Sequence, residues 1–411
     1  MNLFNPYLVF ATASLLTARA FSQTTVGDAV AVAPQPAPTL YLEASQEAVD
    51  RTEFTRTITK SIPVDSKAAL SIENRFGDVS VSLWDRNEFR LQIMVTASSP
   101  DAGEAKKALN AVQIDERREG PLYAFKTLID KEFESSQANG KESETQSIGD
   151  ERTYPNGLKT SWKVSRKESG TILRISYRIS MPKENSLTIK NSFGNTIIPD
   201  FWAPLSVSSK FGDVTGAALN SANTKIKASF GNVTIRELQN GNLDMAFGDL
   251  DINWGNVLQI EQKHGKLTIG ETNKVDAKTS YGRTLIGAIK QSGTFKTKYA
   301  EQFRVAKLGS ATTRINVESN YSSVSLPMQS TPNCDFDVTV TNGGFSYPNV
   351  PNLQLLAQPG PPPTPSTGVL SIAPVRPVRP NQPRQYVGRV GNGEGPTIKV
   401  VATYGDVRFN K

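Results

Sequence analysis

The stretch IKASFGNVTI at residues 226–235 joins an aromatic ring, a glycine and an asparagine, and the chain repeats this combination along its length. SKFGDV (209–214), MAFGDL (245–250) and QKHGKL (262–267) are neighbouring copies. The ring positions follow one another at separations of 17 to 22 residues, at Phe193, Phe211, Phe230, Phe247, His264, Tyr281, Tyr299 and Tyr321. A period this short, without a helical segment inside it, is typical of a β-solenoid with one coil per repeat.

The apolar residues of each copy change parity at the glycine. Ile226, Ala228 and Phe230 alternate in one phase, whereas Val233 and Ile235 alternate in the other. Because side chains alternate between the two faces of a strand, the Gly-Asn pair is predicted to turn a corner between two strands that both face inward. The ring is then the inward residue before the corner, and the glycine supplies the positive φ that the turn requires.

The predicted fold is therefore all-β. It is a single-stranded parallel β-helix (β-solenoid) with about 17–19 residues per coil, and an N-terminal β-rich cap with one short helix precedes it. The structural repeat set comprises Phe193, Phe211, Phe230, Phe247, His264 and Tyr281 with Gly194, Gly212, Gly231, Gly248, Gly265 and Gly282. Two residues before each ring, a second inward ladder is expected to bond along the axis, at Asn191, Ser209, Ala228, Met245, Gln262, Thr279, Thr297 and Ser319.

Changes of composition divide the chain into segments. Proline-dense and polar stretches interrupt the strand pattern, and the ring motif returns as ATYGDVRF near residue 409. The predicted segments are a signal peptide (1–22), a linker (23–49), a cap with first coils (50–185, polar loop 130–160), solenoid repeats (186–347), a proline-rich excursion (348–386) and a terminal coil (387–411).

The first residues carry the features of an export signal. An apolar run from Tyr7 to Leu16 precedes Ala18-Arg19-Ala20, the small-x-small pattern that signal peptidase accepts. The alternative is a buried N-terminal helix, although the following stretch reads as an exposed linker. Export to the periplasm, the outer-membrane surface or the medium is expected. Cys334 is the single cysteine, so it is expected to be a small apolar residue near a strand.

Positive charge is concentrated in one part of the chain. The formal net charge is +7, and eleven basic residues face four acidic ones between Glu261 and Arg314. In an exported protein such a stretch could bind acidic polysaccharide rather than nucleic acid, although charge that keeps a strand-rich surface soluble is the simpler explanation. The candidate polyanion-binding residues are Lys263, Lys266, Lys278, Arg283, Lys296 and Lys298.

The sequence offers little for catalysis. The repeat-linked acids Asp78, Asp213, Asp249 and Asp406 share their position with Asn195, Asn232, Lys266 and Arg283, which favours a turn role over a metal or acid–base site. His264 is the single histidine and is expected to be a packed ring. The tryptophans could stack on sugars or cover the edge of the core, at Trp84, Trp162, Trp202 and Trp254. We expect no enzyme, no cofactor and no metal site.

Two longer stretches carry a family resemblance. ALSIENRFGDVSVSLWDRNEFRLQIMVTASS (69–99) and GRVGNGEGPTIKVVATYGDVRF (388–409), with the FGD and FGN array between them, resemble the DUF4097-type bacterial adhesin domain family. That family is related to the auto-transporter adhesin head GIN domains and is frequent in Bacteroidetes. The resemblance covers roughly residues 65–411. It implies an exported parallel β-helix and no catalytic residues.

Three functional hypotheses follow. The leading one is a non-enzymatic, exported β-solenoid that binds envelope polysaccharide or a cell-surface protein in an adhesin-like way. The alternative is a structural envelope protein that associates with itself. The third is a carbohydrate-active β-helix enzyme.

Overall fold

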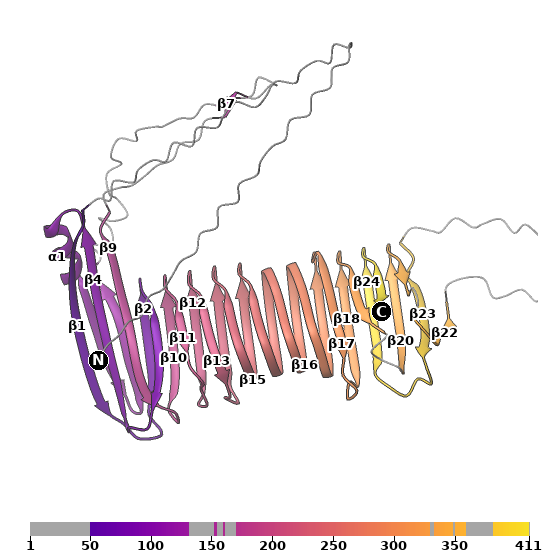
Figure 1. The fold of residues 1–411 in the computed structure, drawn as a ribbon, viewed down its shortest axis with the longest axis horizontal. Helices are drawn as coiled ribbons and strands as arrows, with labels where there is room; N and C mark the ends of the chain where they lie inside the picture. The colour runs from indigo at the N-terminus through magenta and orange to yellow at the C-terminus, as the bar shows by residue number, and fades with distance from the viewer. Residues whose placement is uncertain are drawn as a thin grey trace, which may run out of the picture. The chain divides into compact units, whose positions relative to one another are not determined.

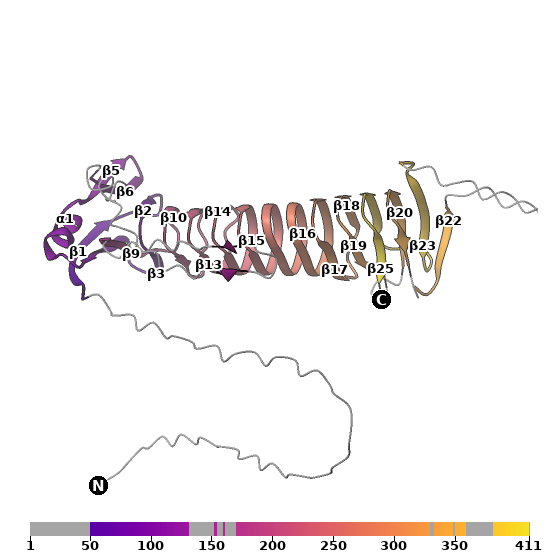
Figure 2. The ribbon, with the colours of Figure 1, turned by 90° about the horizontal axis from the view of Figure 1, so that it is seen from above.

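The repeat motif separates two strands. In most repeats the first strand ends just before the ring, and the second begins three residues after it. The first strands are β2 (Ala69–Arg75), β10 (Ser186–Ser192), β12 (Leu205–Lys210), β14 (Thr224–Ser229), β18 (Arg314–Asn320), β24 (Thr397–Thr403) and β20 (Cys334–Thr341). The second strands are β3 (Val79–Trp84), β11 (Thr196–Ile198), β13 (Val214–Leu219), β17 (Gln302–Leu308), β19 (Val324–Pro327), β25 (Val407–Asn410) and β21 (Phe345–Ser346). Two long strands, β15 (Val233–Ala246) and β16 (Leu250–Lys298), pass through consecutive repeats (Figure 2).

These elements belong to a computed structural model, which describes residues 50–130, 152–153, 159–160, 170–328, 333–347, 350–358 and 381–410. All of them lie in the unit Val49–Lys411, and they form strands almost throughout, with one α-helix (Figure 1). The prediction of an all-β chain with one helix is confirmed. The predicted signal peptide and linker, most of the polar loop and residues 359–380 of the proline-rich segment lie outside the described residues.

Consecutive repeats pair in parallel at the spacing of the motif. Leu205 pairs with Leu187, eighteen residues earlier, and with Thr224, nineteen residues later. Ile226 then pairs with Leu243, seventeen residues later. The sequence period is therefore the register of the sheet, and each repeat lies beside the next (Figure 2).

One apolar side chain per repeat forms a continuous column inside the stack. Ile72, Ile189, Val207, Ile226 and Leu243 are register partners from one repeat to the next. All five are at most 2% exposed. Burying such a side chain contributes about 1.5–3 kcal/mol, so the column stabilises the stack at every step.

The N-terminal end of the stack is closed by antiparallel strands. β9 (Ile172–Pro182) pairs in parallel with β3 and antiparallel with β4 (Glu88–Ser99), and β4 pairs antiparallel with β1 (Thr52–Pro63). β6 (Leu122–Ile129) pairs in parallel with β2 and antiparallel with β5 (Val112–Glu119). The sheet is consequently mixed. Outside it, β7 (Arg152–Thr153) pairs with β8 (Lys159–Thr160).

The helix α1 (Ala102–Asn110) packs on this end, against β4 and β1 (Figure 1). It begins at Asp101, whose carboxylate accepts hydrogen bonds from the amides of Gly103 at 2.6 Å and Glu104 at 3.3 Å. This N-cap satisfies amides that lack a partner inside the helix. Ala105 and Ala108 are fully buried, as their helical spacing predicts.

The other end departs from the sequence prediction. β24 lies between β18 and β20, pairing in parallel with both, so the segment 387–411 does not form the terminal coil of the stack. β20 pairs on its other side with β23 (Arg384–Val390), and β23 pairs with β22 (Leu353–Ala357), both antiparallel. The sequence alone gave no sign of this order, because the last motif follows the others along the chain.

A buried polar cluster joins the N-terminal end to the first repeats. The Asn74 amide donates to the carbonyls of Gly77 at 3.0 Å and Ile175 at 2.9 Å, and its oxygen accepts from Thr127 at 3.2 Å. The Thr127 and Tyr177 hydroxyls lie 2.8 Å apart. These residues come from β2, β6 and β9, so the cluster ties three strands together.

Tyr177 gives a test of this cluster. Burial raises the pKa of its phenol to about 12, against an ordinary value of 10.0, while the hydrogen bond with Thr127 acts in the opposite direction. The neutral phenol is therefore favoured in the folded state, and its contribution to stability is lost as the pH rises from about 10 through 12. Relative to wild type, Tyr177→Phe is expected to lose less stability over that range, by about 2 kcal/mol at pH 12. Urea titrations at pH 8 and pH 12 would measure this difference, and parallel pH profiles of the two proteins would contradict it.

Cys334 lies inside the last repeats. It is fully buried, and burial raises the pKa of its thiol to about 11. Its sulfur is 3.8 Å from the Met328 sulfur. The residue occupies an apolar position in β20, as its place in the sequence predicts.

Candidate functional site

Ten side chains form one stack along the repeats, and we name this stack the ring stripe. Neighbouring ring centroids are 4.6 to 5.2 Å apart, with interplanar angles of 0° to 13°. Its members, in order along the stack, are Phe76, Phe193, Phe211, Phe230, Phe247, His264, Tyr281, Tyr299, Tyr321 and Tyr404. The stripe thus has a phenylalanine half and a tyrosine half, with His264 between them.

The rings point outward, and the prediction that they point into the core is wrong. Phe230 is 47% exposed and Tyr281 is 52% exposed, and His264 is exposed as well. Two residues before the ring, Ala228 is 1% exposed, as the alternation predicts. The inward pattern therefore holds up to the ring and fails at the ring itself.

The backbone at the ring explains this failure. Each of the ten ring residues has a positive φ, between 52° and 63°. This left-handed conformation interrupts the alternation of the strand and turns the ring out of the sheet. It costs an L-residue roughly 1–2 kcal/mol, and Asn342 adopts it at the same position of the last repeat. Strain of this kind, repeated in every repeat, points to a use for the exposed ring.

The glycine after each ring has a different role from the predicted one. None of the six predicted repeat glycines has a positive φ. A Cβ at Gly212 would lie 2.0 Å from the Gly194 carbonyl oxygen, and one at Gly231 would lie 2.2 Å from the Gly212 oxygen. Glycine is needed because the corners of consecutive repeats come into close contact.

One repeat shows how the corner changes where the preceding repeat offers no side-chain acceptor. Ala300 follows Tyr299, and there the Glu301 amide donates to the Gly282 carbonyl at 2.9 Å. In the earlier repeats the equivalent amide bonds a side-chain oxygen instead, as the Asn195 amide does to Asp78 at 2.8 Å. Arg283 stands at the accepting position before Glu301 and has no acceptor to offer.

The Asp and Asn side chains at the corners form a ladder of hydrogen-bond acceptors along the repeats. Asn195, Asp213, Asn232 and Asp249 each accept, through a side-chain oxygen, a hydrogen bond from the amide two residues after the next ring, at 2.8 to 3.0 Å. The acids weighed as metal ligands thus bind backbone amides. Within the described residues, no three His, Cys, Asp or Glu side chains come together as a possible metal site.

The second predicted ladder lies inside, two residues before each ring. Its eight side chains are between 0% and 9% exposed. Asn191 and Ser209 bond the carbonyl of the glycine three residues later, at 2.9 Å each. Gln262 also reaches the Gly248 carbonyl of the preceding repeat at 3.0 Å. Most of these polar side chains donate hydrogen bonds to backbone carbonyls at the corners and not to one another. The expected ladder of side-chain hydrogen bonds along the axis is therefore not what the structure shows.

The stacking decides which part of each ring a partner can touch. The inner eight rings have a neighbour on each face, so their exposed area comes from the ring edges. A sugar packs against the face of an aromatic ring, and the faces of the inner rings are covered by the neighbouring rings. The ring stripe therefore offers a continuous apolar edge, with tyrosine hydroxyls along one half, to a partner that packs along it.

The six candidate polyanion-binding residues lie close to the stripe on consecutive repeats, but three of them are ion-paired. Lys263 is 3.0 Å from Glu261, Arg283 is 2.6 Å from Glu301, and Lys296 is 2.8 Å from Glu318. The others are Lys266 and Lys298 beside rings, and Lys278 beside Asp276 and Glu261. Half of the predicted basic patch is thus neutralised by carboxylates of the same surface, which weakens its attraction for a polyanion.

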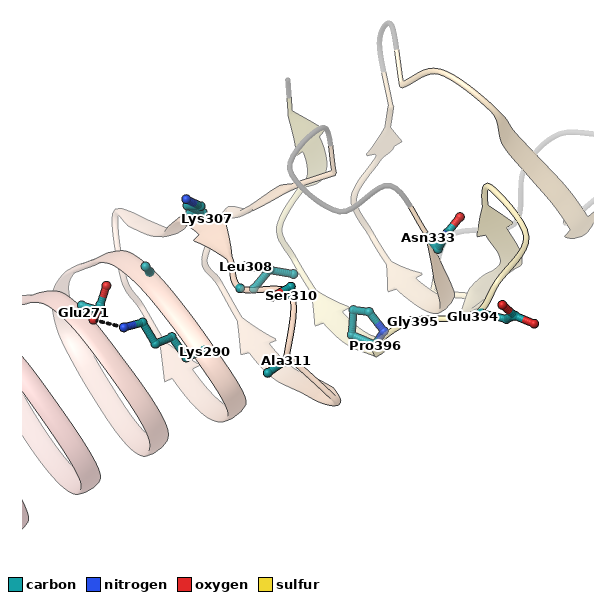
Figure 3. A pocket seen from close by; sticks show the side chains of 12 residues that line it. Glu271, Lys290, Lys307, Leu308, Ser310, Ala311, Asn333, Glu394, Gly395 and Pro396 are labelled. Atoms are coloured by element: carbon teal, nitrogen blue, oxygen red, sulfur yellow. Dashed lines mark ion pairs between the residues drawn. The ribbon is translucent and has the colours of Figure 1, made fainter.

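An open groove lies outside the stripe, near the far end of β16 (Figure 3). Its volume is about 630 Å³, and it is lined by Lys307, Glu394 and Pro396 among others. Lys290 Nζ lies 2.5 Å from Glu271 Oε1 of the adjacent repeat, and the dashed line in Figure 3 marks this ion pair. Of the two carboxylates that line the groove, Glu271 is thus ion-paired, and Glu394 accepts a hydrogen bond from the Asn392 side-chain amide at 3.0 Å.

The three tryptophans among the described residues are separate from the stripe. Trp84 is half-buried and donates from Nε1 to the Glu88 carbonyl at 3.0 Å, and Trp254 is half-buried. Trp202 is 52% exposed. Trp162 lies outside the described residues.

These features define an all-β repeat protein whose stacked strands carry a line of exposed rings. No family model matches the chain, and no curated protein matches it. Two solved structures are similar in part. A "putative cell adhesion protein" from Clostridium sporogenes has 9% identity and a TM-score of 0.17, covering 87% of this chain and 99% of its own. A "putative adhesin" from Bacteroides fragilis has 12% identity and a TM-score of 0.27, covering 86% and 97%. At these values the function has to be argued from the residues of this chain.

Proposed function

We propose that the chain is a non-enzymatic, exported β-solenoid of the cell envelope that binds another protein in an adhesin-like way through the ring stripe. The observation that carries this proposal is the exposure of the rings. Eight of the sixteen exposed large apolar side chains among the described residues belong to this one line, at Phe193, Phe211, Phe230, Phe247, Tyr281, Tyr299, Tyr321 and Tyr404. Apolar groups gathered on one surface mark an interaction site, whereas scattered ones do not.

The solenoid part of the proposal rests on the parallel pairs and their register of 17 to 19 residues. Export rests on the apolar run followed by Ala18-Arg19-Ala20. A protein partner is favoured over envelope polysaccharide because ring faces are covered and because Lys263, Arg283 and Lys296 are ion-paired.

The recurring strain supports the same proposal. Glycine or asparagine would adopt the left-handed conformation at a lower cost, and the chain uses Asn342 for it once. Placing a phenylalanine, tyrosine or histidine there in ten repeats gives up stability locally. A contact surface made of those rings accounts for that arrangement.

Photo-crosslinking in the producing cells tests the proposal. A photoreactive phenylalanine derivative is placed at Phe230 or Tyr299 in the stripe, or at Ile197, which is 50% exposed but outside it. Cross-linked protein bands are expected from the two stripe positions and not from Ile197. If the stripe positions give no protein adduct, or no more than Ile197 does, the proposed function is wrong.

A further inference from the structure

The residues on either side of the ring stripe carry matching charges. The residue before each ring ends the first strand, and the second residue after the ring precedes the second strand, so the two lie on opposite sides of the stripe. Where the first is basic, the second is acidic in three repeats, namely Arg75 with Asp78, Lys210 with Asp213, and Lys298 with Glu301. In three other repeats the residue before the ring is neutral and polar, and the second residue after the ring is neutral as well. These pairs are Ser192 with Asn195, Ser229 with Asn232, and Asn320 with Ser323.

Four repeats depart from this pattern. Lys263 and Lys266 are both basic on either side of His264, and the remaining pairs join a neutral residue to a charged one, namely Ala246 with Asp249, Ser280 with Arg283, and Thr403 with Asp406. Around His264, the acids Glu261 and Asp249 lie close by: Glu261 pairs with Lys263, and Asp249 accepts from the Lys266 amide at 2.8 Å. The Lys263 ammonium is thus met by an acid of its own surface, whereas the Asp249 contact is with the Lys266 backbone amide and not with the Lys266 charge.

At the Phe211 repeat the matched charges do not pair with each other, whereas Glu301 of another matched repeat is 2.6 Å from Arg283. Lys210 lies 5.3 Å from the centroid of the Phe211 ring, and Asp213 accepts from the Asn232 amide at 2.8 Å. Within the described residues, neither Lys210 nor Asp213 forms an ion pair. Both side chains are exposed, one on each side of the ring.

We infer that a second copy of this chain docks along the ring stripe in the same direction, forming a two-fold symmetric dimer. The inference rests on the proposed function, because both use the stripe as the contact surface. A two-fold axis parallel to the stack brings every ring to its own counterpart and exchanges the two sides. Lys210 of each copy then faces Asp213 of the partner subunit, and the same holds for the other matched repeats.

The opposite orientation is disfavoured by the same residues. With two fully overlapped stacks running in opposite directions, the third ring of one copy meets the eighth of the other. Lys210 would face Lys298 of the partner subunit, and Asp213 would face Glu301 of the partner subunit. Like charges placed across an interface select against that orientation, while matched ones set the register.

The rings suit a self-complementary contact. In the parallel arrangement phenylalanine edges meet phenylalanine edges, and each of the four tyrosines meets its counterpart. A phenol hydroxyl is both donor and acceptor, so two identical tyrosines can hydrogen-bond to each other. The apolar edges provide most of the affinity, since exposed charge pairs contribute little.

Charge exchange in the full chain tests the dimer. Sedimentation equilibrium over about a hundredfold range of concentration would give the dimer Kd of wild type, Lys210→Asp and Asp213→Lys. Each variant alone places like charges at two symmetric contacts, and its Kd is expected to rise about tenfold. An equimolar mixture of the two variants restores both contacts, because each new side chain faces one of opposite charge, and its Kd is expected to return to within about threefold of wild type.

Two controls separate the stripe from its surroundings. Lys225→Asp changes the same charge on the same face, in β14, away from the stripe, and is expected to leave Kd unchanged. Phe230→Asn removes one ring and keeps a residue type that tolerates positive φ, and it is expected to raise Kd, whereas Ile197→Asn is not. Circular dichroism checks that each variant is folded.

Three results would overturn the dimer. They are a wild-type chain that stays monomeric throughout the concentration range, a dimer indifferent to both stripe charges and to Phe230→Asn, and single variants that weaken the dimer without rescue by mixing. A monomeric chain whose stripe still cross-links to a different protein in cells would leave the proposed function standing and remove the second copy as its partner.

Discussion

Replacing Gly231 with alanine is expected to lower the free energy of unfolding by about 3 kcal/mol or more. The new Cβ would lie 2.2 Å from the Gly212 carbonyl oxygen, and the obstacle is backbone, which cannot rotate aside as a side chain does. The two repeats would have to separate at this corner, and the ring contact between Phe211 and Phe230 would weaken with them. Urea unfolding followed by circular dichroism measures the change.

Gly170 offers the matched control for this substitution. A Cβ at Gly170 meets no atom within 4 Å, and its φ is not in the left-handed region. Gly170→Ala is expected to leave stability unchanged or to raise it by about 0.4–1 kcal/mol, because alanine restricts the unfolded chain. Equal losses at both glycines would show that close contact between corners is not what requires glycine.

Asn74→Ala is expected to cost about 2–4 kcal/mol. Its amide bonds the carbonyls of Gly77 and Ile175, and its oxygen accepts from Thr127, all inside the protein. Removing the amide leaves these buried groups without their partner, and a buried polar group that lacks a hydrogen bond carries its full cost of desolvation. The loss should appear as a lower midpoint in urea with an unchanged slope.

A surface asparagine provides the comparison. Asn242 is exposed, and its amide reaches Gln259 at 3.4 Å on the neighbouring repeat. Asn242→Ala is expected to change stability by less than about 0.5 kcal/mol. If Asn74→Ala were equally mild, the buried cluster would not be what ties β2 to β6 and β9.

The repeat period and the inward residues could be predicted from the sequence. The spacing of the rings is the register of the parallel pairs, and the alternation of Ile226 and Ala228 assigns their burial correctly. Both inferences depend on regular strands, where the side-chain period is fixed by the backbone. They hold wherever the backbone is extended.

The direction of the rings could not be obtained in this way, because one left-handed residue reverses the alternation. A phenylalanine is an unusual residue at positive φ. Of the residues in the motif, the glycine was therefore the expected one to adopt that conformation. One signal was available: His264 and four tyrosines share the ring position, and burying a polar tip in half of the repeats would be costly. Polar members of a supposedly buried column point to the surface.

The charges beside the rings were also visible in the sequence but had no meaning there. Asp213 was interpreted only as a turn residue, and Lys210, on the other side of the ring and the glycine, was not considered. Only when the ring is known to project outward do these two residues become the borders of one surface. The six candidate polyanion-binding residues gave the opposite outcome, because carboxylates of the same or the next repeat pair with three of them, namely Lys263, Arg283 and Lys296.

The position of β24 between β18 and β20 has a consequence for the order of assembly. Repeats up to β18 can be added one after another as the ribosome makes them, each on a neighbour that already exists. β20 is made before β24 but needs it as its neighbour, so it must wait for a strand synthesised more than fifty residues later. Closing such a long loop is slow relative to local pairing. The last two repeats should therefore be the late step of folding, and newly made chains expose the β18 edge until that step is complete.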